Sequence, residues 1–423
     1  MSREGGNIWY PYTQMKTSGA PIRIVRGEGA YLYDDAGNQY IDAISSWWTN
    51  IHGHAHPHIA ERIAAQAKTL EHVIFSGFTH EPAERLADKL LEYIPYHSKV
   101  FYTDNGSTAV EVAVKMALQY WSNEGQQRNK LIALRDAYHG DTFGSMSISA
   151  RGVFTQPYQP LLFEVEFLDT PDYSNRHHVI SQLNQIIQLN HQQIAALIFE
   201  PLVLGSAGML MYSSEILDEI ISICKHNNIL AIADEVMTGF GRTGKFLATD
   251  YCTHKPDIIC LSKGITGGFL PFAATTCTGE IFDAFYSDDK HKMLFHGHSY
   301  SGNPLGCAAG VAGLELFEME KTMERVAHIS DKHSRFASSI RNHPGILEVR
   351  QQGTILAMEI QTNASTSYMN PIRDRAYSYF INRKILLRPL GNVIYVLPPY
   401  CIKDEDLDRI YIAIGDFVGA IEV

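Results

Sequence analysis

The stretch Ile229-Leu230-Ala231-Ile232-Ala233-Asp234 decides the fold of this chain, together with Ile258-Ile259-Cys260-Leu261-Ser262-Lys263. Each is a short apolar run, rich in branched side chains, of the length expected for a buried parallel strand. The second run leads directly into Gly264 and Gly267-Gly268, so it has a glycine-rich exit. Open α/β sheets bind ligands beyond the carboxyl ends of their strands. We therefore expect Asp234 and Lys263 to face one crevice.

An acid and an amine in one crevice suit pyridoxal 5'-phosphate. The lysine amine forms a Schiff base with the aldehyde of this cofactor, and the carboxylate keeps a proton on its pyridine nitrogen. Each residue also has an ordinary explanation, Lys263 as a loop lysine and Asp234 as a helix N-cap. The rest of the chain decides between the two interpretations.

Strands and helices alternate from about residue 98 to residue 270, which predicts an α/β fold with a mainly parallel sheet covered by helices on both faces. The C-terminal part has mixed helices and strands, with helices at 304–324 and 326–342 and strands at 354–360 and 393–397. A hairpin at 29–42 precedes the sheet. We expect a large domain over residues 50–310, and a smaller α+β domain formed by 1–49 with 311–423.

The net charge of −11 is spread along the 423 residues, which argues against binding to nucleic acid and favours a soluble protein. The six cysteines show neither a CxxC pair nor metal-ligand spacing. Neither a secretion signal nor a membrane-spanning stretch is visible, so we expect a cytoplasmic protein that does not bind membranes.

A turn at Asp104-Asn105-Gly106-Ser107 follows the strand at 100–103 and precedes a helix, whose start we assign to a capping box of Thr108 and Glu111. The free amides and positive dipole end of such a helix bind phosphate. Many loops between a strand and a helix look similar, so the turn carries weight only beside Asp234 and Lys263.

Four histidines alternate at positions 52, 54, 56 and 58. A strand would place them on one face and suggest a metal site, but Gly53 and Pro57 interrupt any strand. No cysteine or acid stands beside them at ligand spacing, so we expect no bound metal.

Several separated motifs resemble the class III aminotransferases, which are fold-type I pyridoxal-phosphate enzymes. The motifs are Asn105-Gly106-Ser107, Tyr138-His139-Gly140, Glu200-Pro201, the run 234–244 with Lys263 after it, and Gly302-Asn303-Pro304. Their common order over most of the chain makes coincidence unconvincing. The resemblance implies a homodimer with shared active sites that acts on small molecules.

The resemblance also implies roles for single residues. The implied catalytic residues are Lys263, Asp234 and Tyr12. The implied cofactor-binding residues are Gly106, Ser107, Tyr138, Asp234, Lys263 and, across the dimer interface, Ser299. Asp141 and Arg242 are implied neighbours of the site.

Within the class, Trp9-Tyr10-Pro11-Tyr12-Thr13, Ser45-Ser46-Trp47-Trp48 and Arg388-Pro389 resemble the branch that forms 7,8-diaminononanoate from 8-amino-7-oxononanoate, with S-adenosylmethionine as amino donor, in biotin synthesis. This implies substrate-binding roles for Trp47, Trp48, Tyr138, Gly297 and Arg388. An apolar slot with one cation at its end suits a long-chain acid. Adjacent tryptophans on a strand would face opposite sides, so one of the two is expected to be structural.

Two positions depart from the family pattern: Leu204 replaces a glutamine and His298 replaces a proline before Ser299. The donor therefore stays open between S-adenosylmethionine and lysine. Further alternatives are an aminotransferase for ω-amino acids or diamines, an epimerase or decarboxylase on the same scaffold, and a non-enzymatic metal-binding protein built on the histidines.

Overall fold

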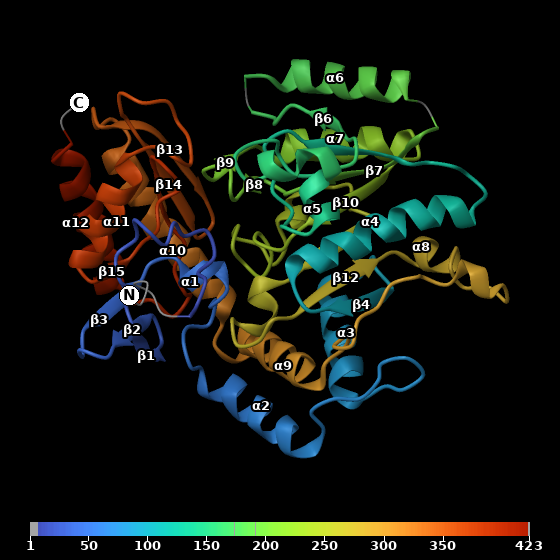
Figure 1. Cartoon of the computed structure of the whole chain (residues 1–423), viewed down its shortest axis with the longest axis horizontal. Helices are drawn as coiled ribbons and strands as arrows, with labels where there is room; N and C mark the ends of the chain where they lie inside the picture. Colours follow the sequence, from blue (N-terminus) through green and yellow to red (C-terminus); the bar gives the residue numbers. More distant parts are fainter. Residues whose placement is uncertain (1–6, 173, 191, 422–423) are drawn as a thin grey trace.

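A seven-stranded sheet forms the centre of the computed structural model, which describes residues 7–172, 174–190 and 192–421 (Figure 1). In spatial order the strands are β4 (Lys99–Thr103), β12 (Ala273–Cys277), β11 (Ile258–Leu261), β10 (Leu230–Asp234), β7 (Ile194–Phe199), β5 (Lys130–Leu134) and β6 (Glu166–Leu168). β12 runs antiparallel to both of its neighbours, while the pairs from β11 to β6 are parallel. The prediction of a mainly parallel sheet is confirmed.

The strands carry apolar side chains on both faces because helices cover both faces. On β10, Ala231 and Ala233 join one buried cluster and Ile232 joins another. The first cluster includes the apolar face of α7 (Ser214–His226), and the second includes that of α4 (Gly106–Asn123). This two-sided burial explains why the run before Asp234 contains no polar residue.

The other helices of the described residues are α1 (Ser45–Trp48), α2 (Pro57–Thr69), α3 (Glu81–Tyr93), α5 (Phe143–Ser147), α6 (Arg176–Leu189), α8 (Gly279–Asp283), α9 (Pro304–Met319), α10 (Thr322–Ile340), α11 (Ile372–Asn382) and α12 (Asp404–Gly419). The two helices predicted at 304–324 and 326–342 are both present, as α9 and α10, but the break between them lies a few residues earlier than predicted. The chain turns at Lys321, whose φ is 50°, and α10 begins there.

Both ends of the chain meet in a second sheet. The predicted hairpin is present as β2 (Tyr31–Asp34) and β3 (Gln39–Asp42), with β1 (Ile24–Glu28) beside β2. The C-terminal strand β15 (Ile385–Leu386) pairs in parallel with β3. Figure 1 shows these N-terminal strands next to α10, α11 and α12.

Two smaller sheets complete the fold. One contains β13 (Ile346–Gln352), β14 (Ile355–Ile360) and β16 (Val393–Val396), and the other contains β8 (Val203–Leu204) and β9 (Leu210–Met211). The sequence predicted β14 and β16 but not β13.

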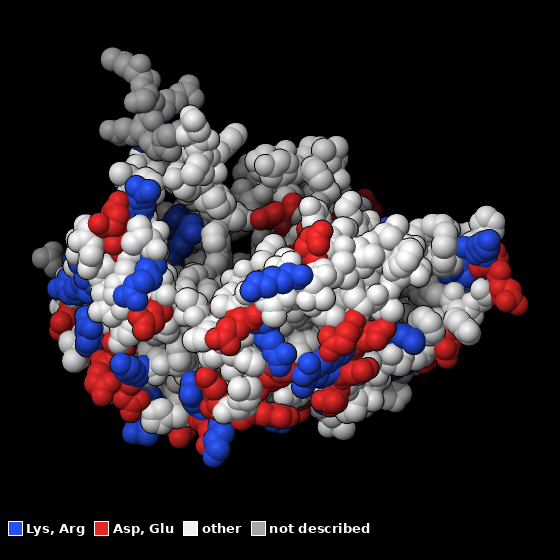
Figure 2. All heavy atoms as spheres, turned by 90° about the horizontal axis from the view of Figure 1, so that it is seen from below, with Lys and Arg blue, Asp and Glu red and all other residues white. Residues whose placement is uncertain are grey.

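Acidic and basic side chains are interspersed over the face shown in Figure 2, so this face presents no broad basic surface. Within the described ranges, no helix is long and apolar enough to cross a bilayer. The six cysteines are free, and all except the half-buried Cys401 are buried.

Candidate active site

A cavity of about 650 Å³ opens beyond the carboxyl ends of β10 and β11. The predicted site residues that line it are Trp48, Gly106, Ser107, Tyr138, Asp234 and Lys263, together with Asp141, which was expected as a neighbour of the site. Its wall also includes residues without a predicted role, among them His139, Thr142, Glu200 and Met237. The two strands that the sequence singled out thus deliver their terminal side chains to one place.

Lys263 follows β11 and begins a short 3-10 turn, with a φ of 46°. Burial lowers the pKa of its amine to about 8, although the nearby carboxylates of Asp234 and Glu200 act in the opposite direction. Its Nζ lies 4.7 Å from the centre of the Trp48 ring. A lysine with such a pKa is partly uncharged near neutral pH, as a nucleophilic amine must be.

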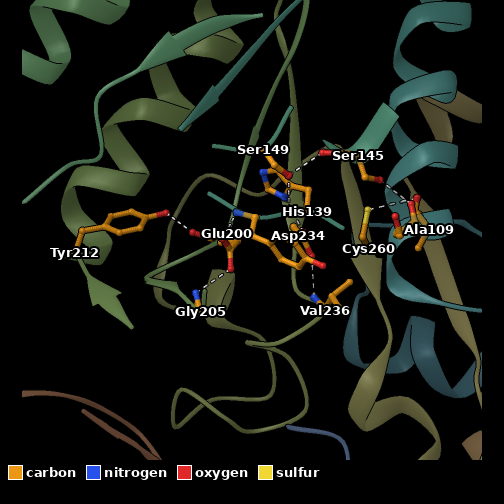
Figure 3. Close-up of polar contacts among 12 residues, drawn as sticks. Ala109, His139, Ser145, Ser149, Glu200, Gly205, Tyr212, Asp234, Val236 and Cys260 are labelled. Carbon is orange, nitrogen blue, oxygen red and sulfur yellow. Dashed lines mark hydrogen bonds and ion pairs between the residues drawn. The ribbon is translucent and has the colours of Figure 1, made fainter. Parts of the chain in front are cut away.

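Two donors orient the carboxylate of Asp234, as Figure 3 shows. His139 Nδ1 lies 2.7 Å from one oxygen, and the backbone N–H of Val236 donates to the other at 3.1 Å. The backbone N–H of His139 in turn donates to Ser149 Oγ at 2.9 Å. The sequence placed His139 in a motif without a role, although its position just beyond β5 is the kind of place where site residues gather.

Glu200 ends β7 and connects two loops of the cavity wall. Its carboxylate accepts the backbone N–H of Tyr138 at 2.8 Å and that of Gly205 at 3.0 Å. Figure 3 shows the Gly205 contact and the bond from the Tyr212 hydroxyl to the Glu200 carbonyl. Burial, reinforced by the charge of Asp234, raises the pKa of Glu200 to about 7.

The helix α4 begins earlier than predicted. The capping box is formed by Asn105 and Thr108, with a 3.0 Å bond from the Thr108 N–H to the Asn105 side chain, so the prediction of Thr108 with Glu111 is wrong. Glu111 instead accepts the Thr142 hydroxyl at 2.5 Å. Gly106 and Ser107 therefore occupy the first helical turn, where N–H groups lack an acceptor within the helix. These amides suit an anion at the cavity edge.

Two glycines keep this anion-binding turn compact. A Cβ atom at Gly106 would lie 2.7 Å from Val236 Cγ1, and one at Gly140 would lie 2.3 Å from Ser107 Oγ. Gly140 also has a φ of 131°, which L side chains rarely adopt. The Lys263 amine, the Asp234 carboxylate and the turn at Gly106 and Ser107 thus surround a single cavity.

Tyr12, Trp47 and Arg388 lie beside the cavity and do not line it. The Tyr12 hydroxyl donates to the carboxylate of Asp141, and burial together with this bond raises the pKa of Tyr12 to about 12. The same hydroxyl lies 3.4 Å from that of Tyr138. The Tyr12 and Trp47 ring centres are 5.9 Å apart, and the Arg388 guanidinium lies 4.8 Å from the Trp47 ring centre. Tyr12 and Trp47 thus form an aromatic path beside the cavity, and the Arg388 guanidinium lies at its end.

The two tryptophans lie in a tight turn, not in the strand that their adjacency suggested. Trp48 is buried and its indole N–H donates to the Tyr395 hydroxyl at 3.0 Å, whereas Trp47 is 44% exposed. Arg242 is fully buried and donates to the Trp48 carbonyl at 3.2 Å. Arg242 therefore stabilises the turn from its buried side.

Gly297 and Ser299 do not line the cavity of their own chain. Both are exposed, and a Cβ atom at Gly297 would meet no atom within 4 Å. His298 lies between them in sequence, and its Nε2 is 3.9 Å from the carboxylate of Asp104. The other departure from the family pattern, Leu204, is buried in β8 away from the lining.

Three of the four alternating histidines contact separate carboxylates. His54 pairs with Asp42, His56 with Glu320 and His58 with Glu315, at distances of 2.7 to 2.9 Å. Burial lowers the pKa of His52 to about 3. Among the described residues, no group of three His, Cys, Asp or Glu side chains has the arrangement of a metal site.

Comparison with known proteins places this geometry in a family. The model of the class-III aminotransferases matches residues 12–418. A protein from Synechococcus elongatus, named adenosylmethionine-8-amino-7-oxononanoate aminotransferase, is 46% identical over 98% of this chain and 99% of its own. One of the same name from Geobacter sulfurreducens is 38% identical over 95% and 93%, respectively.

Solved structures of similar proteins have the same fold. The adenosylmethionine-8-amino-7-oxononanoate aminotransferase of Methanocaldococcus jannaschii superimposes with a TM-score of 0.93 at 35% identity, covering 99% of this chain and 98% of its own. An amine transaminase from an uncultivated Pseudomonas species, in its PLP-bound form, has a TM-score of 0.91 at 31% identity, covering 98% of each chain. With its amine, carboxylate and anion-binding turn around one cavity, the chain belongs to the class III aminotransferases.

Proposed function

We propose that the chain transfers an amino group from S-adenosylmethionine to 8-amino-7-oxononanoate, forming 7,8-diaminononanoate for biotin synthesis. The observation that carries the proposal is that a cofactor-sized cavity and a path suited to a long-chain acid lie next to each other. A cavity with an amine, a carboxylate and an anion-binding turn adjoins an aromatic path that ends at Arg388. Relatives that match nearly the full length carry the name of this activity.

The cavity fits pyridoxal 5'-phosphate. The amides of Gly106 and Ser107 would hold its phosphate, Asp234 would face its ring nitrogen and Tyr138 would cover its ring. Lys263 would hold its aldehyde through the side-chain amine. When bound, the cofactor supplies an electron-withdrawing ring that stabilises negative charge on the carbon next to the transferred nitrogen.

The side chains of this site have separate roles in the reaction. Lys263, with its lowered pKa, takes a proton from the substrate carbon and returns one. Asp234 presents an anionic oxygen whose direction is fixed by His139 and Val236. Glu200 holds the loop of Tyr138 in place.

The aromatic path suits a long acid with an apolar chain. Trp48 forms the wall next to Lys263, and Tyr12 and Trp47 continue the path outward. Arg388 stands beside Trp47, where its guanidinium can grip a carboxylate with two hydrogen bonds. The ketone of the acceptor would thereby be directed into the cavity, where Lys263 can deliver a proton to its carbon.

We further propose a cytoplasmic homodimer in which Gly297 and Ser299 of one copy complete the cavity of the other. Both residues are exposed and lie outside the cavity of their own chain, which supports this assignment. The proposed large domain is 50–310, and the proposed small domain is 1–49 with 311–423. The pairing of β3 with β15 supports the grouping of the two ends.

The donor is tested by mixing the reconstituted protein separately with S-adenosylmethionine, lysine and an ω-amino acid. We expect only S-adenosylmethionine to abolish the absorbance of the lysine-bound cofactor, and 7,8-diaminononanoate to appear by mass spectrometry when the oxo acid follows. A response to lysine alone would change the donor. A response to the ω-amino acid without formation of 7,8-diaminononanoate would favour the activity suggested by the similar amine transaminase.

The acceptor site is tested with Arg388→Ala. We expect the KM for 8-amino-7-oxononanoate to rise while the donor reaction keeps its rate, because the guanidinium serves only the oxo acid. Equal loss in both reactions would instead assign Arg388 a structural role.

A further inference from the structure

One of the alternating histidines, His54, contacts Asp42, and Asp42 in turn binds the backbone of the turn that carries both tryptophans. We propose that Asp42 and His54 form a positioning pair, which holds the turn Ser45–Trp48 in a strained conformation and so fixes Trp47 and Trp48 for the oxo-acid substrate. This inference rests on the function proposed above and assigns specificity-determining residues to it.

The turn Ser45–Trp48 adopts a backbone that a free chain disfavours. The φ angles of Ser45, Ser46 and Trp48 are 50°, 58° and 68°, and the ψ of Ser46 is −85°. Non-glycine residues rarely adopt positive φ, and three within four residues need contacts from outside to persist. Such strain gathers where side chains must be aimed.

The contacts that hold this backbone converge on Asp42, whose side chain is fully buried. Its carboxylate accepts the backbone N–H of Ser46 at 2.7 Å, the Ser46 hydroxyl at 3.2 Å and the backbone N–H of Ile44 at 3.1 Å. All three donors belong to the turn or to the residue before it. Asp42 therefore binds the turn through Ser46, one of its strained residues.

Among the described residues, His54 supplies the one polar contact to this carboxylate that comes from elsewhere in the chain, with Nε2 at 2.8 Å. Its backbone is itself fixed, since it exchanges two hydrogen bonds with Gly29 at 2.7 and 3.1 Å. A Cβ atom at Gly27 would lie 2.7 Å from His54 Cβ, so this glycine leaves the room that the imidazole needs. The backbone around Gly27 and Gly29 thus holds the imidazole ring of His54 against Asp42.

The direction of the turn decides where both indole rings point. Trp48 stands over Lys263 and Trp47 stands over Arg388, at 4.7 and 4.8 Å respectively. The turn also has supports of its own, because Ser45 Oγ donates to the Leu397 carbonyl and the Trp48 indole donates to Tyr395. Loss of His54 should therefore leave the turn folded but less well aimed.

The same histidine series provides a matched control. His56 pairs with Glu320 at 2.9 Å, so it makes an equivalent imidazole–carboxylate contact two residues further on. That contact reaches the end of α9 and does not touch the turn. Comparing His54→Leu with His56→Leu separates an effect on the turn from the loss of any histidine pair.

The experiment measures the KM for 8-amino-7-oxononanoate, the rate of the donor reaction, the cofactor absorbance and the near-ultraviolet circular dichroism of the tryptophans. We expect His54→Leu to raise the KM about tenfold to hundredfold, since a buried hydrogen bond to a charged group is lost. The donor rate and cofactor absorbance should stay near those of the wild type, while the tryptophan dichroism changes. His54→Gln keeps a nitrogen donor at similar reach and should restore the KM to within about threefold.

Equal KM values for His54→Leu and His56→Leu, or unchanged tryptophan dichroism in His54→Leu, would overturn the proposal. Should His54→Leu fail to fold, His54→Asn replaces it, because its shorter amide falls short of Asp42 and is expected to raise the KM where His54→Gln does not. A wild type that leaves the oxo acid unchanged would overturn the proposed function alone. The dichroism of the variants would still decide whether Asp42 and His54 hold the turn.

Discussion

Lys263 should behave as an amine with a pKa of about 8, against the ordinary value of 10.5. The cause is burial, which removes the water that stabilises an ammonium ion; the carboxylates of Asp234 and Glu200 only partly compensate. At pH 7 such an amine is uncharged about one tenth of the time, compared with about one part in 3000 for an ordinary lysine. At pH 7 the uncharged, nucleophilic fraction of Lys263 should therefore be about 300 times that of a lysine in an unfolded peptide.

The assay is brief acetylation of the cofactor-free protein from pH 6 to pH 11, with the modified Lys263 peptide quantified by mass spectrometry. A synthetic peptide covering residues 258–268 provides the unfolded reference. We expect half-maximal rates near pH 8 for the protein and near pH 10.5 for the peptide. A midpoint of 10 or above in the folded protein would refute the argument that burial dominates.

The variant Asp234→Asn tests the sign of the neighbouring charge. Because the Asp234 carboxylate raises the pKa of Lys263, its removal should move the midpoint below that of the wild type. The matched control is Asp169→Asn, whose carboxylate pairs with Arg135 at the surface and should leave the midpoint unchanged. A rise of the midpoint in Asp234→Asn would contradict the electrostatic account.

Three further predictions concern the same cavity. Gly106→Ala should weaken binding of pyridoxal phosphate about tenfold by equilibrium dialysis, because its Cβ would meet Val236 at 2.7 Å, whereas Gly152→Ala, with open space around it, should not. As pH rises from 4.5 to about 7, the wild type should lose thermal stability relative to Glu200→Gln, because the folded state holds the Glu200 proton more tightly than the unfolded state does. The cofactor-free variant Lys263→Met should unfold with a free energy about 3 kcal/mol above that of the wild type at pH 7, and this gain should fade towards pH 10.5, where the unfolded lysine also loses its proton. Denaturant titrations at several pH values would measure the last two effects.

The sequence predicted the parts of the site that depend on local pattern. The runs before Asp234 and Lys263 are apolar because their strands are buried on both faces, and burial of this kind is visible in a single stretch. The turn at Gly106 was also found. Its capping box was misassigned by three residues because Asn105 and Thr108 both satisfy cap chemistry.

The parts that the sequence missed depend on partners distant along the chain. The conformation of the tryptophan turn depends on Asp42 and on Tyr395, and adjacency of Trp47 and Trp48 carries no trace of either. The clamp of Glu200 on the loops of Tyr138 and Gly205 exists only after β5 and β7 lie side by side. β13 was overlooked because Glu348 and Arg350 interrupt its apolar pattern.

The hydrogen bond between Trp48 and Tyr395 spans 347 positions of the chain, and this separation orders events during synthesis. The lining residues that would grip the cofactor are all translated by residue 272, well before Tyr395, Leu397 and β15 leave the ribosome. The nascent chain therefore contains Lys263 and the other lining residues before it contains the residues that hold the turn Ser45–Trp48. A chain that ended before Tyr395 would contain Lys263 but would lack the hydrogen bond that holds the Trp48 indole.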